Sequence, residues 1–425
     1  MNVLLDIHSL ENRGDWLMFE AMLEQVRLRR PTARIGVPER VYNLNPGIYA
    51  PKDVVPVINP VGKNGWLRKT ITKLGAFLLS RRRPLFSDEI DLVLFSPGFR
   101  FSDQFEVPPE RYLAAEQKWF GSFRKKGRRF YFMPQAFGPF SVESTKVRMK
   151  RLFALATHIY PREKTSYESV LPLAADSRAV SISPDFTSLY RGEDYQLPFG
   201  KRDYVVVIPN RQMLVRAPDG IAGKYCDFMF GLIGMLRRRG ENIVLLNHEG
   251  ASDIGLIEVL NASIDNAGLA VCGVSGGACK SVIAGAKLVV TSRFHGLVSA
   301  LSEGVPALCT SWSHKYQELV GEMDCPQSCI CLKSVDDALR VVEDALAMPE
   351  KYTSSVQARA ALERKVLAMW DEILPVEGDV KPCGKCVGSI RKTFYITPRR
   401  WDAMMWPARL PLKLVHKVWA TICPR

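Results

Sequence analysis

Short runs of apolar residues alternate with longer amphipathic stretches along most of this 425-residue chain. Most of the runs are continuous Val, Ile and Leu rather than two-residue alternations, which is typical of strands buried on both faces of a parallel sheet. The runs that predict strands are Val3–Ile7, Leu92–Phe95, Phe130–Met133, Tyr204–Ile208, Ile243–Leu246, Leu269–Cys272, Lys287–Thr291 and Ala307–Thr310.

Helix-length stretches separate these runs, among them Asp15–Arg29, Glu143–Ala156, Lys224–Arg239, Gly276–Ala284 and Gly296–Ser302. Strands and helices that alternate at this spacing predict βαβ units with right-handed crossovers. The pattern pauses between about 186 and 202, where a polar stretch with Pro and Gly reads as a linker. We therefore expect an α/β protein with two doubly wound Rossmann-like domains, 1–190 and 200–375. A basic, Trp-containing tail, 376–425, follows a helix predicted over Pro349–Ile373.

The composition fits a folded globular protein, with 47% hydrophobic and 24% charged residues. The start of the chain, MNVLLDIHSL, lacks the pattern of a signal peptide. No window approaches the ~20 consecutive apolar residues of a membrane-spanning helix. The cysteines are scattered, mostly within apolar runs, as expected in a reducing compartment. We therefore expect a cytoplasmic protein.

Basic residues exceed acidic ones by 58 − 44 = 14, which favours an anionic partner. Much of the excess lies in residues 66–83 and 391–425, which combine Lys and Arg with apolar and aromatic residues. Such segments can lie in a membrane interface, so we expect association with the inner face of a membrane. The alternative is a solvated basic face with the tail's tryptophans packed on the enzyme. Neither segment resembles a nucleic-acid-binding module, so no nucleic acid is expected.

The stretch Lys287–Leu319 carries the strongest chemical signal. Its first predicted strand ends just before Arg293 and His295, and a helix begins at once. Ligands bind beyond the carboxyl ends of parallel strands, and a helix N-terminus favours anions. The next strand adds His314 and Lys315 to the same edge. These residues predict a phosphate or carboxylate site; the alternative is that Arg293 makes local salt bridges and His295 is structural.

The same stretch resembles a known family. SRFHGLVSALSEGVPAL followed by SWSHKYQEL is similar to the signature of the polysaccharide pyruvyl transferases. Further blocks resemble family segments in the same order, over roughly residues 3–325: NRGDWLMFEAML, MPQAFGPF, PREKTSYE, SPDF and NHEGASD. The segment SPGFRFSD departs from the Gly-Gly pair usual in the family, which leaves the acceptor open.

The resemblance implies a fold like that of the GT-B glycosyltransferases and a pyruvyl transfer from phosphoenolpyruvate to a free or lipid-linked sugar, with no cofactor. A donor that carries a carboxylate and a phosphate needs several cations, preferably arginines. A histidine suits the proton transfers. The residues expected to act are His295 and Arg293 in catalysis, Arg162, Arg293, His314 and Lys315 in donor binding, and Asn12, Gly14 and Gln135 in acceptor binding.

Other interpretations remain open at this point. A GT-B glycosyltransferase would use a nucleotide-sugar, although no clear acidic motif is placed to hold a ribose. A non-catalytic member would bind a glycan or lipid, although it would be expected to have lost Arg293 or His295. Asn12 with Gly14 can also be a helix cap, and Gln135 can belong to a turn. The single CGKC at Cys383 and Cys386 lacks two further zinc ligands, so no metal is expected.

Overall fold

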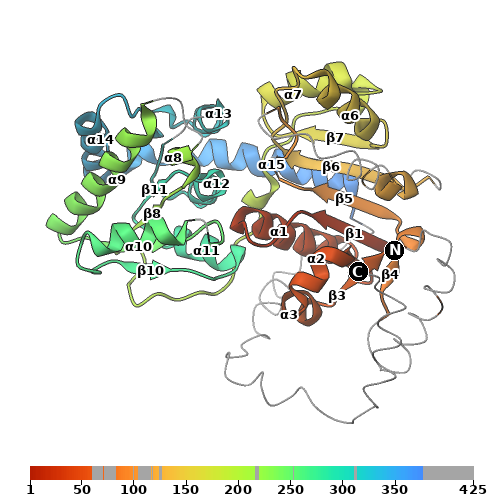
Figure 1. Ribbon diagram of the computed structural model, residues 1–425, viewed down its shortest axis with the longest axis horizontal. Helices are drawn as coiled ribbons and strands as arrows, with labels where there is room; N and C mark the ends of the chain where they lie inside the picture. Colours follow the sequence, from red (N-terminus) through yellow and green to blue (C-terminus); the bar gives the residue numbers. More distant parts are fainter. Residues whose placement is uncertain are drawn as a thin grey trace, which may run out of the picture.

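The computed structural model describes residues 1–59, 70, 83–98, 100–103, 116, 118–123, 127–215, 220–251, 253–310 and 314–376. Two parallel sheets lie side by side, each with helices packed on it (Figure 1). The seven-stranded sheet has the order β4-β3-β2-β1-β5-β6-β7, and the six-stranded sheet has the order β10-β9-β8-β11-β12-β13. Two doubly wound α/β halves are thus confirmed.

All strand pairs in both sheets are parallel. The first sheet consists of β1 (Asn2–Ile7), β2 (Arg34–Pro38), β3 (Val54–Ile58), β4 (Leu85–Phe86), β5 (Leu92–Ser96), β6 (Arg129–Gln135) and β7 (His158–Pro161). The second consists of β8 (Tyr204–Ile208), β9 (Asn242–Leu246), β10 (Leu269–Val271), β11 (Leu288–Thr291), β12 (Ala307–Thr310) and β13 (Cys329–Ile330). The strand order reverses between β1 and β5 and between β8 and β11, where loops diverge and leave room for a ligand.

The helices cover the faces of the sheets (Figure 1). They are α1 (Arg13–Arg29), α2 (Glu39–Leu44), α3 (Pro46–Tyr49), α6 (Glu143–Phe153), α7 (Lys164–Val170), α8 (Gln212–Val215), α9 (Ile221–Arg238), α10 (Ile254–Ala262), α11 (Gly276–Ala284), α12 (Phe294–Ser302), α13 (His314–Glu322), α14 (Val335–Ala347) and α15 (Val356–Ile373). Short 3-10 turns include η5 (Phe186–Ser188) and η7 (Pro349–Tyr352).

Every strand predicted from the sequence is present, with bounds shifted by at most a few residues. Strands β2, β3, β4, β7 and β13 were not predicted. Glycine and proline interrupt the apolar pattern in two of them, at Gly36, Pro38 and Pro56, and the other three are only two to four residues long.

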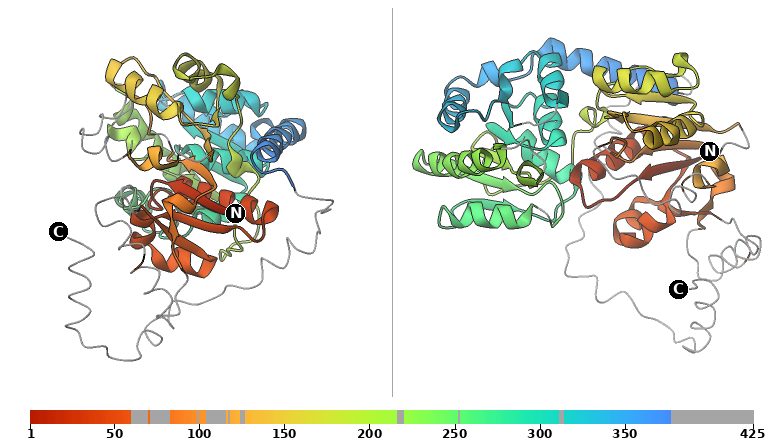
Figure 2. Two further views of the ribbon diagram at one scale, coloured as in Figure 1. Left: turned by 90° about the vertical axis from the view of Figure 1, so that its right-hand side faces the viewer. Right: turned by 45° about the horizontal axis from the view of Figure 1, so that its top comes forward.

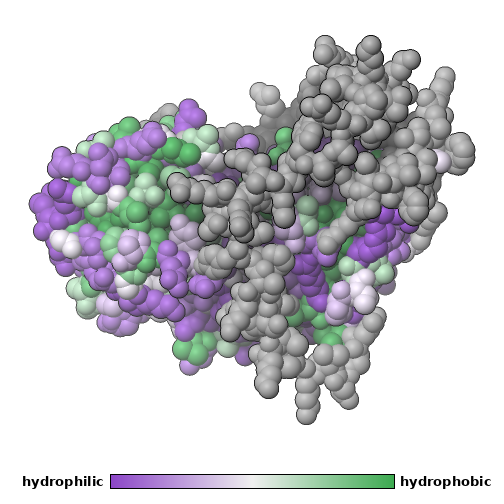
Figure 3. Space-filling view, turned by 90° about the horizontal axis from the view of Figure 1, so that it is seen from below, coloured by the Kyte–Doolittle hydropathy of each residue, from purple (hydrophilic) through white to green (hydrophobic). Residues whose placement is uncertain are grey.

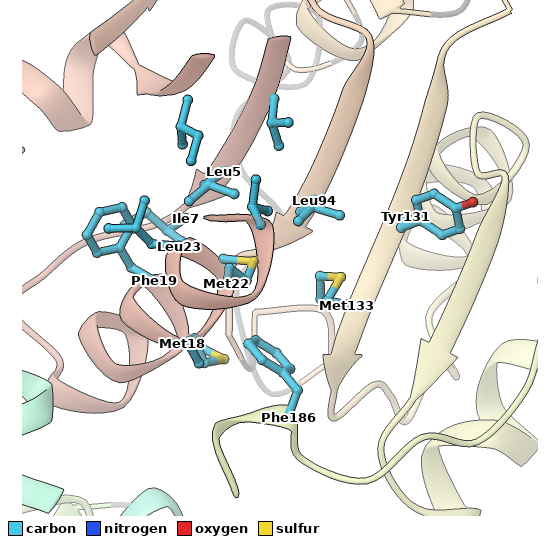
Figure 4. Packing of buried hydrophobic residues seen from close by; sticks show 14 of the residues in the cluster. Leu5, Ile7, Met18, Phe19, Met22, Leu23, Leu94, Tyr131, Met133 and Phe186 are labelled. Atoms are coloured by element: carbon cyan, nitrogen blue, oxygen red, sulfur yellow. The ribbon is translucent and has the colours of Figure 1, made fainter. Parts of the chain in front are cut away.

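The core of the first half forms where α1 lies across the sheet (Figure 4). Apolar side chains recur on one face of α1 because of its 3.6-residue period, and they pack against one face of the sheet. Phe186, from η5, closes this layer. The labelled members of the cluster are Leu5, Ile7, Met18, Phe19, Met22, Leu23, Leu94, Tyr131, Met133 and Phe186.

Helix α15 contributes to both halves. Its first turns bury Ala358 and Leu362 in the core of the second half, and its last turns bury residues in the core of the first. Trp370 is fully buried there, with its ring 6.2 Å from that of Phe186. Figure 2 shows the helix running from one half to the other. The division of the chain near residues 190–200 therefore stays a proposal, with α15 shared between the two cores.

The helix predicted over Pro349–Ile373 is broken in the structure. After the 3-10 turn of η7 the chain is extended at Thr353, and α15 begins anew. The Ser355 hydroxyl accepts a hydrogen bond from the backbone N–H of Ala358 at 2.9 Å and so caps the second segment.

The two segments expected to meet a membrane, 66–83 and 391–425, fall largely outside the described residues. The structure does not describe 60–69, 71–82 and 377–425. Among the residues that are described, no helix has the length and apolar character needed to cross a membrane. The described surface of the half at the left of Figure 3 mixes hydrophilic and hydrophobic patches.

Candidate active site

A cleft of about 690 Å³ lies where the carboxyl edges of the two sheets face one another. Its walls come from the loops that follow the strands of both halves. Six of the residues predicted from the sequence line it: Asn12, Gln135, Arg162, Arg293, His295 and Lys315. Gly14 lies directly against the imidazole of His295. His314 is the first residue of α13, and its side chain lies outside the described part of the structure.

Backbone contacts between the halves close one side of the cleft. The N–H of Arg13 donates to the carbonyl of His248 at 3.0 Å, and the N–H of Gly250 donates to the carbonyl of Glu11 at 2.9 Å. Gly276, at the start of α11, packs directly on the backbone of α1, so any side chain there would collide with Leu17. The loops that bound the cleft are therefore held by hydrogen bonds rather than by a linker alone.

The carbonyl of Ser292, the residue before Arg293, accepts two side-chain hydrogen bonds. Asn210, just after β8, donates from its side-chain amide to the carbonyl of Ser292 at 2.8 Å. Tyr316 donates its hydroxyl to the same carbonyl at 2.9 Å. The first bond joins the ends of β8 and β11, the pair between which the strand order of the second sheet reverses, and the second ties the end of β11 to α13.

Arg293 is buried and held by two carboxylates. Its Nε and Nη2 donate to Asp253 Oδ2 at 3.0 and 2.6 Å, and its Nη1 pairs with Glu249. Burial lowers the pKa of Arg293 to about 10, which still leaves the guanidinium charged near neutral pH. The local salt bridges that the alternative interpretation expected for Arg293 are therefore present. The same contacts hold its guanidinium group in a fixed orientation at the wall of the cleft.

Arg162 reaches the cleft from the first half, after β7. Its Nη1 donates to Asp185 Oδ2 at 3.0 Å. Its guanidinium lies over the ring of Phe294, with Cζ 3.7 Å from the ring centroid. Because Phe294 belongs to α12 of the second half and directly follows Arg293, this stacking joins the two halves at the cleft.

His295 lies in the first turn of α12, with its Nε2 3.3 Å from Asp185 Oδ2. The other oxygen of Asp185 accepts hydrogen bonds from the backbone and hydroxyl of Thr187. Burial alone would raise the pKa of Asp185, but His295, Arg162 and Thr187 outweigh it and hold that pKa well below its usual range. Asp185 is therefore a fixed anion that touches both His295 and Arg162.

Gly14 provides the space for the imidazole. A Cβ at residue 14 would overlap Nδ1 of His295, so only glycine allows α1 and α12 to approach so closely. Asn12 caps α1, with its Oδ1 accepting from the N–H of Gly14 at 2.8 Å. The cap interpretation of Asn12 is thus observed, and the residue also lines the cleft.

Lys315 is half-buried at the start of α13, with Nζ 5.6 Å from the centroid of the Phe294 ring. Burial, together with the charges of Arg162 and Arg293, lowers the pKa of Lys315 to about 7. His248 also lines the cleft and is kept neutral, because burial and the charges of His295 and Arg293 hold its pKa well below the usual value.

Gln135 ends β6 and is only 1% exposed. Within the described residues neither its amide nitrogen nor its amide oxygen has a hydrogen-bond partner, although the residue lines the cleft. Buried polar atoms are normally paired, and among the described residues this amide is an exception.

Two acidic partners of the arginines, Asp185 and Asp253, were not singled out from the sequence. Asp185 belongs to SPDF and Asp253 to NHEGASD, two blocks that were matched to the family without a role for these two residues. We call Arg162, Asp185, Asp253, Arg293 and His295 the paired cluster. Across the described ranges, no group of three or more His, Cys, Asp or Glu side chains is arranged to hold a metal ion, and Cys383 and Cys386 lie outside those ranges.

Solved structures share this arrangement of two halves. UDP-GlcNAc 2-epimerase from Neisseria meningitidis bound to UDP-GlcNAc superposes with a TM-score of 0.52 at 11% identity, covering 87% of this chain and 100% of that one. The Anabaena HepE protein in complex with UDP-glucose gives 0.53 at 11% identity, covering 87% and 98%. At such low identity the likeness shows the fold alone, which is the GT-B type predicted from the sequence.

The family follows from the sequence itself. A model of the polysaccharide pyruvyl transferase family matches residues 12–314, and the chain belongs to this family. No curated protein matches the sequence.

Proposed function

We propose that the protein transfers a pyruvyl group from phosphoenolpyruvate to a sugar of a polysaccharide or of a lipid-linked glycan precursor. The observation that carries this proposal is that Arg162 and Arg293, from opposite halves, line one cleft, with Arg162 stacked on Phe294, the residue that follows Arg293. His295 and Lys315 line the same cleft. Membership of the pyruvyl transferase family supports the reaction class.

The donor carries two anionic groups, and the cleft offers matching cations. Guanidinium groups bind carboxylate and phosphate through paired hydrogen bonds. Arg162 and Arg293 already have carboxylate partners, which fix their orientation and leave their remaining N–H groups for the donor. Lys315, with a pKa of about 7, gains charge as an anion approaches and stabilises the departing phosphate.

In the proposed reaction, His295 gives a proton to C3 of the enol, and C2 becomes electrophilic. An acceptor hydroxyl bonds to C2 through its oxygen and loses its proton to a base. The bond between C2 and the phosphate oxygen then breaks, and phosphate leaves. A second hydroxyl of the same sugar bonds to C2 and loses its proton, which closes the ketal. Asp185 orients the imidazole throughout.

The decisive test is phosphate release from phosphoenolpyruvate with a panel of free and lipid-linked sugars. We expect release to depend on an acceptor and to be lost in His295→Ala and Arg293→Ala. Arg340→Ala, which removes an exposed arginine on α14, is the matched control and should keep full activity. If phosphoenolpyruvate neither binds nor turns over while a nucleotide-sugar does, the donor assignment is wrong and a glycosyltransferase takes its place.

We further propose that the enzyme works in the cytoplasm, at the inner face of the membrane, through residues 66–83 and 391–425. The excess of basic residues in both segments supports this. Flotation with vesicles that contain anionic lipid should recover the full chain but much less of a chain ending at residue 376. Equal recovery of the two would overturn a role for the tail.

A further inference from the structure

Three arginines outside the paired cluster gather at the carboxyl edge of the first sheet. Arg40 is the second residue of α2, just after β2, Arg100 follows β5, and Arg148 belongs to α6. Strands β2, β1 and β5 are neighbours, so the loops that carry Arg40 and Arg100 flank the end of β1. Arg100 and Arg148 line the cleft. We call Arg40, Arg100 and Arg148 the arginine rim.

The arginine rim is incompletely neutralised. Arg148 donates from Nε and Nη2 to Glu116 at 2.9 and 2.8 Å. Arg40 and Arg100 are exposed, and among the described residues their guanidinium groups have no hydrogen-bond or ion-pair partner. Unpaired arginines beside a cleft attract anions and hold phosphate groups well.

Nearby ionisable groups neutralise the positive charge of the arginine rim only in part. Burial raises the pKa of Asp15 to about 8, so this carboxyl is largely neutral near pH 7. Burial also raises the pKa of Asp6, to about 6, and its Oδ2 already accepts from the Trp119 ring N–H at 2.9 Å. Burial, with the charges of Arg100 and Arg40, lowers the pKa of His8 to about 4, so His8 adds no charge.

The unpartnered amide of Gln135 is a second, independent sign of a ligand here. The loops after β5 and β6 run together, because the N–H of Gly138 donates to the carbonyl of Phe101 at 2.8 Å. Gln135 and Arg100 therefore lie on neighbouring loops of one wall. An amide beside cations suits a ligand in which hydroxyls and an anionic group are adjacent.

We propose that the arginine rim binds a phosphate or diphosphate group attached to the acceptor sugar, so that the acceptor is a phosphate-linked sugar rather than a neutral glycan end. The identity of the acceptor rests on the proposed pyruvyl transfer, whereas the anion site does not. Lipid-linked and nucleotide-linked sugars share this chemistry.

The anion site is tested by calorimetric titration of the full chain with inorganic pyrophosphate, with and without saturating phosphoenolpyruvate. We expect pyrophosphate to bind in both conditions. Arg100→Gln should weaken it roughly 10- to 100-fold, since hydrogen bonds to charged groups are the strong ones. Arg178→Gln is the matched control, because it removes one exposed positive charge from the same half, away from the cleft.

Two results would overturn the site: pyrophosphate binding that Arg100→Gln leaves unchanged, or binding that phosphoenolpyruvate abolishes, which would place the anion on the donor cations. Should phosphoenolpyruvate fail to bind at all, the proposed reaction fails and the titration without it still tests the rim.

The acceptor class is tested by phosphate release with three acceptors built on one sugar: a methyl glycoside, a nucleoside diphosphate sugar and a polyprenyl diphosphate sugar. We expect at least one diphosphate-linked acceptor to show a lower KM than the glycoside, and Arg100→Gln to remove the difference with an unchanged KM for phosphoenolpyruvate. Which of the two is preferred identifies the source of the diphosphate. Equal KM values for all three acceptors in the wild type would refute the proposal.

Discussion

The paired cluster and the arginine rim line the same cleft but differ in how their charges are held. In the paired cluster, each arginine donates to a carboxylate at 3.0 Å or less, and Asp185 also lies 3.3 Å from the imidazole of His295. At the arginine rim, Arg100 lacks such a partner within the described residues, and the neighbouring Gln135 amide is unpaired. Under the proposed function, the groups that carry out the chemistry are therefore fixed before substrate arrives, as electrostatic catalysis requires, whereas the groups that recognise the acceptor would be completed by the ligand.

The largest expected effect comes from breaking the paired cluster at its centre. Asp185→Asn keeps the shape of the side chain but removes the anion shared by Arg162 and His295. We expect kcat to fall roughly 10²–10³-fold, because a misoriented imidazole transfers protons poorly. The measurement is the pH profile of kcat, which should change shape as well as height, together with the melting temperature.

Asp176→Asn is the matched control, since Asp176 is exposed and pairs locally with Arg178. A variant at Asp185 that melts lower but keeps the wild-type kcat and pH profile would show that the carboxylate is only structural.

A somewhat smaller effect is expected at Gly14. In Gly14→Ala the added methyl would overlap the imidazole of His295, which must turn away from Asp185. We expect kcat to fall by about 10²-fold, the usual cost of a small misplacement of a reacting group. Gly223→Ala offers a control, because a Cβ there meets no other atom within 4 Å. Full activity in Gly14→Ala would mean that the position of His295 does not limit the reaction.

The pH dependence of kcat/KM for phosphoenolpyruvate tests whether Lys315 contributes to donor binding in addition to the arginines. The pKa of Lys315 is lowered to about 7, so its charge is present below that pH and is lost above it. For phosphoenolpyruvate, kcat/KM should therefore decline as pH rises above 7. If one proton is required, the decline should approach about tenfold per pH unit. Lys315→Arg should move the decline to higher pH, because arginine stays charged. An identical profile in the two proteins would remove Lys315 from the donor site.

The smallest effect is expected at Gln135, the residue with the unpartnered amide near the arginine rim. Gln135→Met fills the same space without an unpaired amide, so the free energy of unfolding should rise by about 1 kcal/mol. Acceptor KM should rise by about tenfold while KM for phosphoenolpyruvate stays the same, since one hydrogen bond to the sugar is lost. Chemical denaturation and initial rates measure the two quantities. A variant that is less stable, with unchanged KM, would show that the amide already has a partner.

Sequence reasoning found the cations of the cleft because of a simple rule of parallel sheets. Arg162 and Arg293 follow strands β7 and β11, and such post-strand positions meet at one edge. Arg162 was identified through its family block, since the four-residue β7 itself was not predicted. Continuous apolar runs gave eight strands correctly, whereas runs broken by Gly36 and Pro56 did not.

The acids that hold these cations were harder to predict. Asp185 lies in an irregular segment after β7, where no periodicity tells which way a side chain points. Its pairing with His295 depends on contact between residues 110 positions apart, across two halves. The same limit applies to Arg100, whose proposed role depends on strand order rather than on its neighbours in the sequence.

Helix α15 has a consequence for how the chain is made. Synthesis runs from the N-terminus, so the strands of the first sheet leave the ribosome well before α15. Yet the core of that sheet includes Val366, Met369 and Trp370 from the end of α15. The half that is made first is thus finished last, and its apolar surface stays uncovered until the second half has been translated. Assembly of the cleft is in this way coupled to completion of nearly the whole polypeptide.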